Sequence, residues 1–328
     1  MITAFTICAN NYLAHAKTLE RSFKKQHPEV HFIIAILDEP NDAINYNDLD
    51  ADEILWIPKL FSGLVNTLKN TYGIAELCTV VKPELFRYLY NKENDIVLYI
   101  DPDIKVFSKF TEVFTALKNN NVVLTPHLCS PTGDVGHPID KDIMRTGVYN
   151  LGFLAMKKTK ETLAFVDWWD KRVKAYGFHD LKKGYFYDQI WLGFAPAFLD
   201  KVYILRDLGY NVANWNLHER KIIKKEEQYF INDLKTPIKF FHYSHYKMEN
   251  EPDIASYNQN FNLENRPDLI PIFNEYKMDL KASGYQFLKE IAYQFGKTNP
   301  PVIIKKESRF SKSKKLFKKA LRVLILGK

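Results

Sequence analysis

The sequence has few cysteines and no long apolar segment. Only three of its 328 residues are cysteine (Cys8, Cys78 and Cys129), and no C-x-x-C spacing occurs. Scattered cysteines in an odd number predict reduced, mostly buried thiols in a cytoplasmic protein, and exclude a disulfide framework or a thiolate zinc site. No run of about 18 apolar residues is present, so we expect no membrane-spanning helix. No basic segment precedes the first apolar run, so we expect no secretory signal.

Positive charge is concentrated at one end of the sequence. The whole chain carries +7, but residues 305–328 alone carry ten Lys or Arg and one Glu, which leaves the remaining residues slightly acidic. Nucleic-acid-binding folds more often spread basic residues over the body, so we expect no nucleic-acid partner. With 46% hydrophobic residues, the chain can build the core of one large domain.

Apolar strand-like segments alternate with helix-like segments through the first 250 residues. Strands are predicted at 2–9, 31–37, 53–57, 96–100, 122–125, 149–156, 202–205 and 238–241, and helices at 13–25, 76–90, 109–119 and 161–176. Residues 126–147 contain several Pro and Gly, and predict a long loop. This alternation predicts an α/β fold with a mixed, largely parallel central sheet. Ligands of such sheets bind beyond the carboxyl ends of the strands.

The most informative motif follows the predicted strand at 96–100. Asp101 and Asp103 come directly after this strand and are separated only by Pro102, which fixes the turn. Two carboxylates at a strand end suit a hard divalent cation that also binds a diphosphate. The alternative is an ordinary polar strand terminus with a turn.

Two further segments offer candidate binding residues. Asn10, Asn11 and Tyr12 follow the first strand, where a Tyr ring can stack on a base and an Asn can bind a ribose or base edge. An Asn at this place is equally typical of a helix N-cap. Lys82 and Arg87 precede the Asp101 strand and can pair with carboxylate or phosphate, although most such residues are only solvated.

Two candidates come later in the chain. Asp188 and Gln189 lie between an aromatic-rich loop and an apolar segment, where they can also cap a helix. His242 closes the predicted strand at 238–241, and an imidazole beside two carboxylates is a plausible third metal ligand. A His after a strand is often only a polar terminus.

Taken together, these motifs resemble GT-A-fold glycosyltransferases, particularly family 8 and related bacterial polysaccharide- and lipopolysaccharide-assembly enzymes. ANNY at 9–12 is similar to the family's nucleotide-binding start, YIDPD at 99–103 to its D-x-D strand, and YNLGFL at 149–154 to its N-x-G strand. DQ at 188–189 and FFHYSHY at 240–246 are similar to its later motifs. The resemblance covers about residues 1–247, and the ordered set is more specific than any single motif.

The resemblance implies a Rossmann-like GT-A fold, a metal-dependent hexosyltransferase and a nucleotide-diphosphate sugar donor, most simply a UDP-sugar. It implies metal ligands that hold Mn²⁺ or Mg²⁺ on the diphosphate: Asp101, Asp103 and His242. Together with the residues argued above, the candidate donor-binding set is Asn10, Asn11, Tyr12, Lys82, Arg87, Asn150, Gly152, Trp215 and Lys247. Asp188 and Gln189 are implied beside the transferring sugar.

Two departures from the family pattern affect these assignments. Asn10 stands where the family often has an acidic residue, which leaves the base open. His245 replaces the glycine of the family's H-x-x-G-x-x-K pattern, so this region is rebuilt or His245 is a rival ligand. The resemblance favours transfer with retention, in which no strong base is needed. Transfer with inversion would need a general base, and Asp188 is the first candidate.

The C-terminal segment has a different character from the domain before it. We divide the chain into a catalytic domain at 1–295 and a basic amphipathic tail at 296–328, in which Phe310, Phe317, Leu321 and Leu324 recur at helical spacing. Such a helix suits an anionic membrane surface. It fits a protein on the inner face of the cytoplasmic membrane, with a saccharide or lipid-linked saccharide acceptor. A terminal helix docked on its own domain and a disordered basic tail are the alternatives.

Two other functions compete with the transferase. A sugar nucleotidyltransferase shares the strand-helix layout, but normally opens with a glycine-rich phosphate loop, and Ala9-Asn10-Asn11-Tyr12 stands there instead. A membrane-peripheral protein that binds sugar nucleotides without turnover would be expected to lose some of these polar residues.

Overall fold

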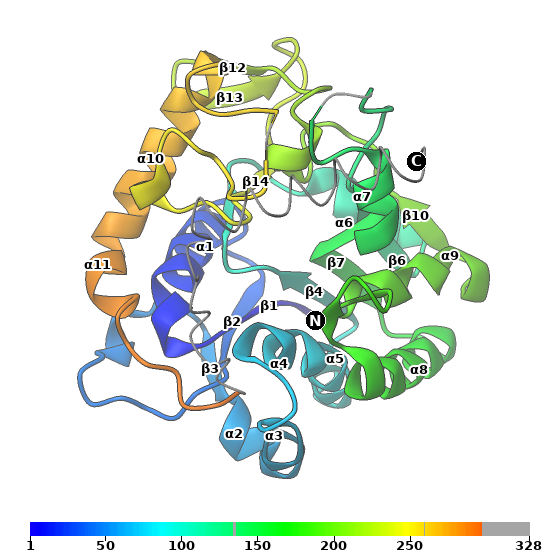
Figure 1. Ribbon diagram of the computed structural model, residues 1–328. Coiled ribbons are helices and arrows are strands. Elements are labelled where there is room, and N and C mark those ends of the chain that lie inside the picture. Colours follow the sequence, from blue (N-terminus) through cyan, green and yellow to red (C-terminus); the bar gives the residue numbers. More distant parts are fainter. Residues whose placement is uncertain (134–135, 259, 297–328) are drawn as a thin grey trace, which may run out of the picture. The chain divides into compact units, whose positions relative to one another are not determined.

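A seven-stranded sheet in the order β10-β6-β7-β4-β1-β2-β3 is the centre of the computed structural model (Figure 1). The structure describes residues 1–133, 136–258 and 260–296. The strands of this sheet are β1 (Ile2–Cys8), β2 (His31–Ile36), β3 (Glu53–Trp56), β4 (Ile96–Ile100), β6 (Val122–Pro126), β7 (Tyr149–Lys157) and β10 (Val202–Ile204). Strand β7 runs antiparallel to β4 and β6, and the other neighbours are parallel. The expected mixed, largely parallel sheet is therefore confirmed.

The apolar side chains of the strands divide between the two faces of the sheet, as the period of two requires. On one face, Ala4, Cys8 and Ile34 pack with the helix α1 (Leu13–Gln26). On the other, Phe5 and Ile33 pack in a cluster shared with the helices α5 (Lys82–Asn91) and α8 (Lys160–Tyr176). The central strands are buried on both faces, which explains their nearly continuous apolar sequences.

Shorter elements complete the described part of the chain. The remaining helices are α2 (Ile57–Leu60), α3 (Ser62–Leu68), α4 (Ile74–Val80), α6 (Thr111–Asn119), α7 (Asp140–Thr146), α9 (Ala195–Phe198), α10 (Ile270–Ala282) and α11 (Tyr285–Leu288). The remaining strands are β5 (Ile104–Val106), β8 (His179–Asp180), β9 (Tyr185–Phe186), β11 (Val212–Ala213), β12 (Ile222–Lys225), β13 (Gln228–Ile231) and β14 (Phe240–His242). Three-residue 3-10 turns include η1 (Asn10–Tyr12) and η4 (Asn214–Asn216).

Two sequence-based predictions need correction. The helix predicted at 76–90 is two helices, α4 and α5, which meet at Val81, because Pro83 has no N–H and is accommodated only in the first turn of a new helix. The long loop predicted at 126–147 contains α7, whose first turn is capped by the carboxylate of Asp142. The other predicted strands and helices occur within a few residues of their expected bounds.

A second, three-stranded sheet, β11-β14-β5, lies at the carboxyl edge of the main sheet. Strand β5 begins directly after Asp103 and pairs antiparallel with β14, so that Ile104 lies opposite His242. This register places two distant sequence motifs side by side. Within the described ranges, no helix has the length and apolarity needed to cross a bilayer. The predicted tail lies outside the described residues, apart from Gly296.

Candidate functional site

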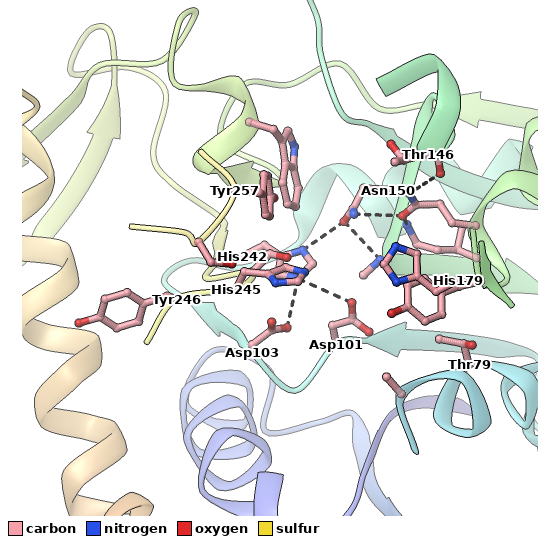
Figure 2. Close-up of a pocket in the computed structure, with 18 of the residues that line it drawn as sticks. Thr79, Asp101, Asp103, Thr146, Asn150, His179, His242, His245, Tyr246 and Tyr257 are labelled. Carbon is pink, nitrogen blue, oxygen red and sulfur yellow. Dashed lines mark hydrogen bonds and ion pairs between the residues drawn. The ribbon is translucent and has the colours of Figure 1, made fainter. Parts of the chain in front are cut away.

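Three potential metal ligands meet where β4 ends. Asp101, Asp103 and His242 each offer one ligand atom, and these atoms lie within 4.8 Å of one another. The Nε2 atom of His242 is 3.1 Å from Asp103 Oδ1 and 3.6 Å from Asp101 Oδ2. Figure 2 shows His242 between the two carboxylates on one side and Asn150 on the other. The pairing of β5 with β14 produces this meeting, and a backbone bond from Tyr243 N–H to Asp103 O reinforces it.

Gly152 makes room for the His242 ring. A Cβ atom at this position would lie 2.4 Å from His242 Cε1 and 2.7 Å from its Nδ1. Neither distance is compatible with a side chain. The backbone of Gly152 also contacts the D-x-D turn, because Asp101 N–H donates to Gly152 O at 2.7 Å. Gly152 therefore connects the D-x-D turn with the histidine.

The three groups perturb one another electrostatically. Burial raises the pKa of Asp101, against the opposing effects of Lys82 and His242. Burial acts in the same direction on Asp103, but the attraction of His242 outweighs it and lowers the pKa of that carboxyl. Burial would lower the pKa of His242, yet Asp103 and Asp101 raise it overall. A site that attracts one positive charge among two carboxylates is also suited to a divalent cation.

This donor set fits the cation that the sequence implied. Two carboxylates and one imidazole suit Mn²⁺ or Mg²⁺ better than a thiolate-loving metal. The second nitrogen of His242 is already bound, since Nδ1 lies 3.2 Å from Asn150 Oδ1, as is usual for a metal-binding histidine. Among the described residues, the cluster includes His242 and not His245.

A buried ion pair lies beside this cluster. The ammonium of Lys82 is 2.6 Å from Asp188 Oδ2, and both side chains are almost wholly buried. The same ammonium lies 3.9 Å above the ring of Tyr99, whose hydroxyl donates to Asp101 Oδ1 at 2.5 Å. Burial raises the pKa of Asp188, and Lys82 opposes that shift. Lys82 thus connects the D-x-D strand electrostatically with Asp188.

These groups line one cavity of about 1050 Å³. This volume is at the upper end of the range for small-molecule sites, about 300–1,000 Å³. At one wall, the ring of Tyr12 is stacked on His15, with 3.9 Å between the ring centres and 6° between the planes. Burial lowers the pKa of His15 to about 4, so this imidazole is neutral near pH 7. Tyr12 and His15 form a flat aromatic pair, suited to a planar ligand.

Most of the candidate residues from the sequence reach this cavity, and two do not. The residues that line it are Asn11, Tyr12, Lys82, Asp101, Asp103, Asn150, Gly152, Asp188, Gln189, Trp215, His242 and Lys247. Asn10 does not line the cavity, and its side chain donates to Glu39 O and accepts from the Tyr46 hydroxyl. Arg87 does not line the cavity and is partly buried between α5 and α8, paired with Glu84 and Asp167.

His245 keeps the backbone conformation that a glycine would have. Its φ angle is +59°, in the left-handed region. This region costs a non-glycine residue about 1–2 kcal/mol, so a glycine would adopt this backbone with less strain. The His245 side chain lies at the cavity wall together with Tyr257 (Figure 2).

Sequence reasoning missed several residues of the cavity. His127, His179, Tyr257 and Thr146 line it, as does His15. Two of these could have been found: His15 is one helical turn after Tyr12, and His127 follows the strand predicted at 122–125. The others lie on α7 and on segments with no periodic pattern, so only the tertiary structure reveals them.

Sequence comparisons give relatives that are themselves uncharacterized. No protein-family model matches the chain. The uncharacterized protein YfnD of Bacillus subtilis (strain 168) is 26% identical over 221 residues, which are 65% of this chain and 67% of that protein. The uncharacterized protein YfnF of the same organism is 23% identical over 253 residues, or 74% and 81% of the two chains.

Solved structures similar to this chain are GT-A-like glycosyltransferases. The galactosyltransferase LgtC, in complex with donor and acceptor sugar analogues, has 16% identity and a TM-score of 0.44, over 82% of this chain and 100% of its own. The bifunctional glycosyltransferase WbbM has 13% identity and a TM-score of 0.48, over 86% and 51%. At these values, the neighbours assign no substrate or residue role to this chain.

Proposed function

We propose that this protein is a metal-dependent glycosyltransferase that moves a hexose from a nucleotide-diphosphate sugar to a saccharide acceptor. The observation that carries the proposal is the Asp101–Asp103–His242 cluster on the wall of a cavity large enough for a nucleotide sugar. The aromatic pair of Tyr12 and His15 on the same cavity favours a nucleoside, with the base stacked on Tyr12. A UDP-sugar is the simplest donor for such a site.

The charges of the cavity suit the departure of a diphosphate. A cation held by Asp101, Asp103 and His242 would neutralise the leaving group as a Lewis acid. Lys247 lies exposed at the cavity and can add a second positive charge as the bond to the sugar breaks. Arg87 has no part in this step, because it does not line the cavity and its guanidinium is paired with carboxylates of α5 and α8.

The Lys82–Asp188 ion pair favours retention over inversion. A general base for inversion must accept the proton of an acceptor hydroxyl. Asp188 is 2% exposed, and its carboxylate is 2.6 Å from the Lys82 ammonium, so it is already engaged in a buried pair. A paired carboxylate is better suited to orient sugar hydroxyls together with Gln189. In the retaining reaction, the departing phosphate takes the acceptor proton.

The acceptor and the location follow from the remaining predictions. A saccharide or lipid-linked saccharide of a bacterial surface polysaccharide is the acceptor that fits the motif resemblance. The basic tail at 296–328 would hold the enzyme on the anionic inner face of the cytoplasmic membrane. Both statements rest on the sequence alone.

The test is release of nucleoside diphosphate from a panel of nucleotide sugars, with and without Mn²⁺. We expect slow hydrolysis of one donor that needs the cation. Asp103→Asn keeps the size of the side chain but removes its charge, and should lower this rate by roughly 100-fold or more. Asp200→Asn is the matched control, because Asp200 is exposed and does not line the cavity.

The outcomes separate the competing functions. Metal-dependent release that is lost in Asp103→Asn and kept in Asp200→Asn supports the transferase. Tight binding of a nucleotide sugar without release, even with saccharide acceptors present, would favour a non-catalytic binding protein. If the folded protein with Mn²⁺ neither binds nor cleaves any nucleotide sugar, the proposed function is wrong.

A further inference from the structure

The side-chain amide of Asn150 is held in one orientation by groups that do not bind the metal. Its Nδ2 atom lies 3.3 Å from Gln189 Oε1. The orientation of Gln189 is itself fixed, because Leu151 N–H donates to Oε1 at 3.0 Å and Nε2 donates to Thr146 O at 2.8 Å. A backbone N–H only donates and a carbonyl only accepts, so neither amide can be turned over without losing bonds.

His127 holds the same amide from a second direction. Its Nδ1 lies 3.4 Å from Val148 O, which can only accept, so the proton of the neutral ring is on Nδ1. Nε2 is then a bare acceptor, 3.3 Å from Asn150 Nδ2. Burial lowers the pKa of His127 to about 4, which keeps this ring neutral under ordinary conditions. The indole of Trp215 packs edge-on against the ring and limits its rotation.

These bonds leave the oxygen of Asn150 facing the metal-binding histidine. Oδ1 accepts from Gly152 N–H at 3.2 Å and lies 3.2 Å from His242 Nδ1. An amide oxygen cannot donate, so His242 must carry a proton on Nδ1. Its Nε2 faces the acceptor oxygens of Asp103 and Asp101 at 3.1 and 3.6 Å, so Nε2 is the nitrogen that gives up its proton when a cation binds between them.

We propose that Asn150, oriented by His127 and Gln189, is a positioning residue that keeps the proton of His242 on Nδ1 when a cation displaces the proton on Nε2. The proposal rests on the metal site of the proposed function. Without Asn150, the nearest acceptors to His242 are the carboxylates themselves. The neutral ring would then hold its proton on Nε2, toward Asp103, where it competes with the metal.

The expected effect on metal affinity is large for Asn150 and smaller for His127. Removing an outer-shell partner of a metal-binding histidine typically weakens metal binding by about 10–100-fold, and we expect this loss for Asn150→Leu. Asn150→Asp retains an acceptor for Nδ1–H, so its Mn²⁺ affinity should stay within about threefold of that of the unchanged protein. His127→Phe keeps a ring but loses the Nε2 acceptor. Because Gln189 still holds the amide in this variant, we expect Mn²⁺ binding to weaken by only about 3–10-fold.

The test measures the metal and the tautomer separately, without turnover. Binding of Mn²⁺ alone is followed by the electron paramagnetic resonance signal of the free ion, for the full chain and each variant. The tautomer is read from ¹⁵N–¹H correlations of the histidine rings at a Mg²⁺ concentration that saturates the unchanged protein, with His242 assigned by its absence in His242→Gln. Asn119→Leu, on the exposed side of α6, is the matched control for the Asn150 substitution.

Each result either supports or overturns the inference. Weaker Mn²⁺ binding together with a change of His242 from Nδ1–H to Nε2–H in Asn150→Leu, both restored in Asn150→Asp, supports it. Unchanged affinity or an unchanged tautomer in Asn150→Leu overturns it, whereas absence of Mn²⁺ binding by the unchanged protein overturns the metal site itself. If Asn150→Leu does not fold, His127→Phe is measured instead, and an Nδ1–H tautomer with full affinity there counts against the proposal.

Discussion

Substitution of Gly152 by alanine tests whether the close approach of β7 to His242 matters for the site. The added methyl group would lie 2.4 Å from His242 Cε1 and 2.9 Å from Asn150 Oδ1. Ordinary carbon contacts are about 3.5–4.0 Å, so the imidazole must move by about 1 Å. His242 Nε2 is now 3.1 Å from Asp103 Oδ1 and 3.6 Å from Asp101 Oδ2, and a displacement of this size disrupts the ligand arrangement.

Two magnitudes follow for Gly152→Ala. Forcing a methyl group into a packed site costs about 1–3 kcal/mol of unfolding free energy. Displacing a ligand and its outer-shell partner together should weaken Mn²⁺ binding by at least the roughly 10–100-fold typical of outer-shell changes. Urea unfolding gives the first quantity, and titration with Mn²⁺ gives the second.

The matched control is Gly63→Ala on α3. A Cβ atom there meets nothing within 4 Å, and alanine is the better helix former by about 0.5–1 kcal/mol. We expect this variant to be as stable as the unchanged protein or slightly more stable, with the same Mn²⁺ affinity. If Gly152→Ala bound Mn²⁺ normally and unfolded at the same urea concentration, our account of the packing between β7 and His242 would be wrong.

Three further perturbations have definite expected results. Lys82→Met leaves Asp188 buried without its partner and should cost about 3–5 kcal/mol in urea unfolding, most of it recovered when Asp188→Leu is added. Glu20 is fully buried, its carboxylate has no hydrogen-bond partner among the described residues, and burial raises its pKa from 4.5 to about 7. Its ionisation therefore opposes folding increasingly as the pH rises from about 4.5 to 7, and Glu20→Gln should be more stable by about 3 kcal/mol at pH 8 but not at pH 4. Equal stability at pH 8 would refute this. Arg87→Met should leave the KM for the donor unchanged, because Arg87 does not reach the cavity; a severalfold rise would contradict that placement.

Much of the central sheet was predictable because its strands carry a local signal. The apolar segments at 31–36 and 96–100 are too short for buried helices and end at polar residues, which favours strands. The helix at 76–90 was predicted as one because the apolar periodicity continues across Val81, and the break at Pro83 depends on how α4 and α5 pack. Helix α7 was missed since its stability comes from capping and tertiary contacts rather than from an apolar stripe.

The candidate site likewise contains residues that the sequence predicts and residues whose placement depends on the tertiary structure. Asp101 and Asp103 could be predicted as site residues because they follow a buried strand. Tyr12 could be predicted because it follows the first strand. The sequence could not predict where the Asn10 side chain points, because a polar side chain after a strand can face a ligand or, as here, bind the backbone of Glu39. Arg87 had the right chemistry, but its side chain is directed to carboxylates of α8 and not into the cavity.

The sequence by itself determined the fold class and the segment that holds the two carboxylates, because hydrophobic period and strand-end polarity are properties of neighbouring residues. Only the tertiary structure decided which histidine joins them, why Gly152 must lack a side chain, and that Lys82 pairs with Asp188. These depend on contacts across 90 to 139 positions of the chain, such as the register that sets Ile104 opposite His242. Such contacts are fixed by how strands pair and helices pack, and no local pattern encodes them.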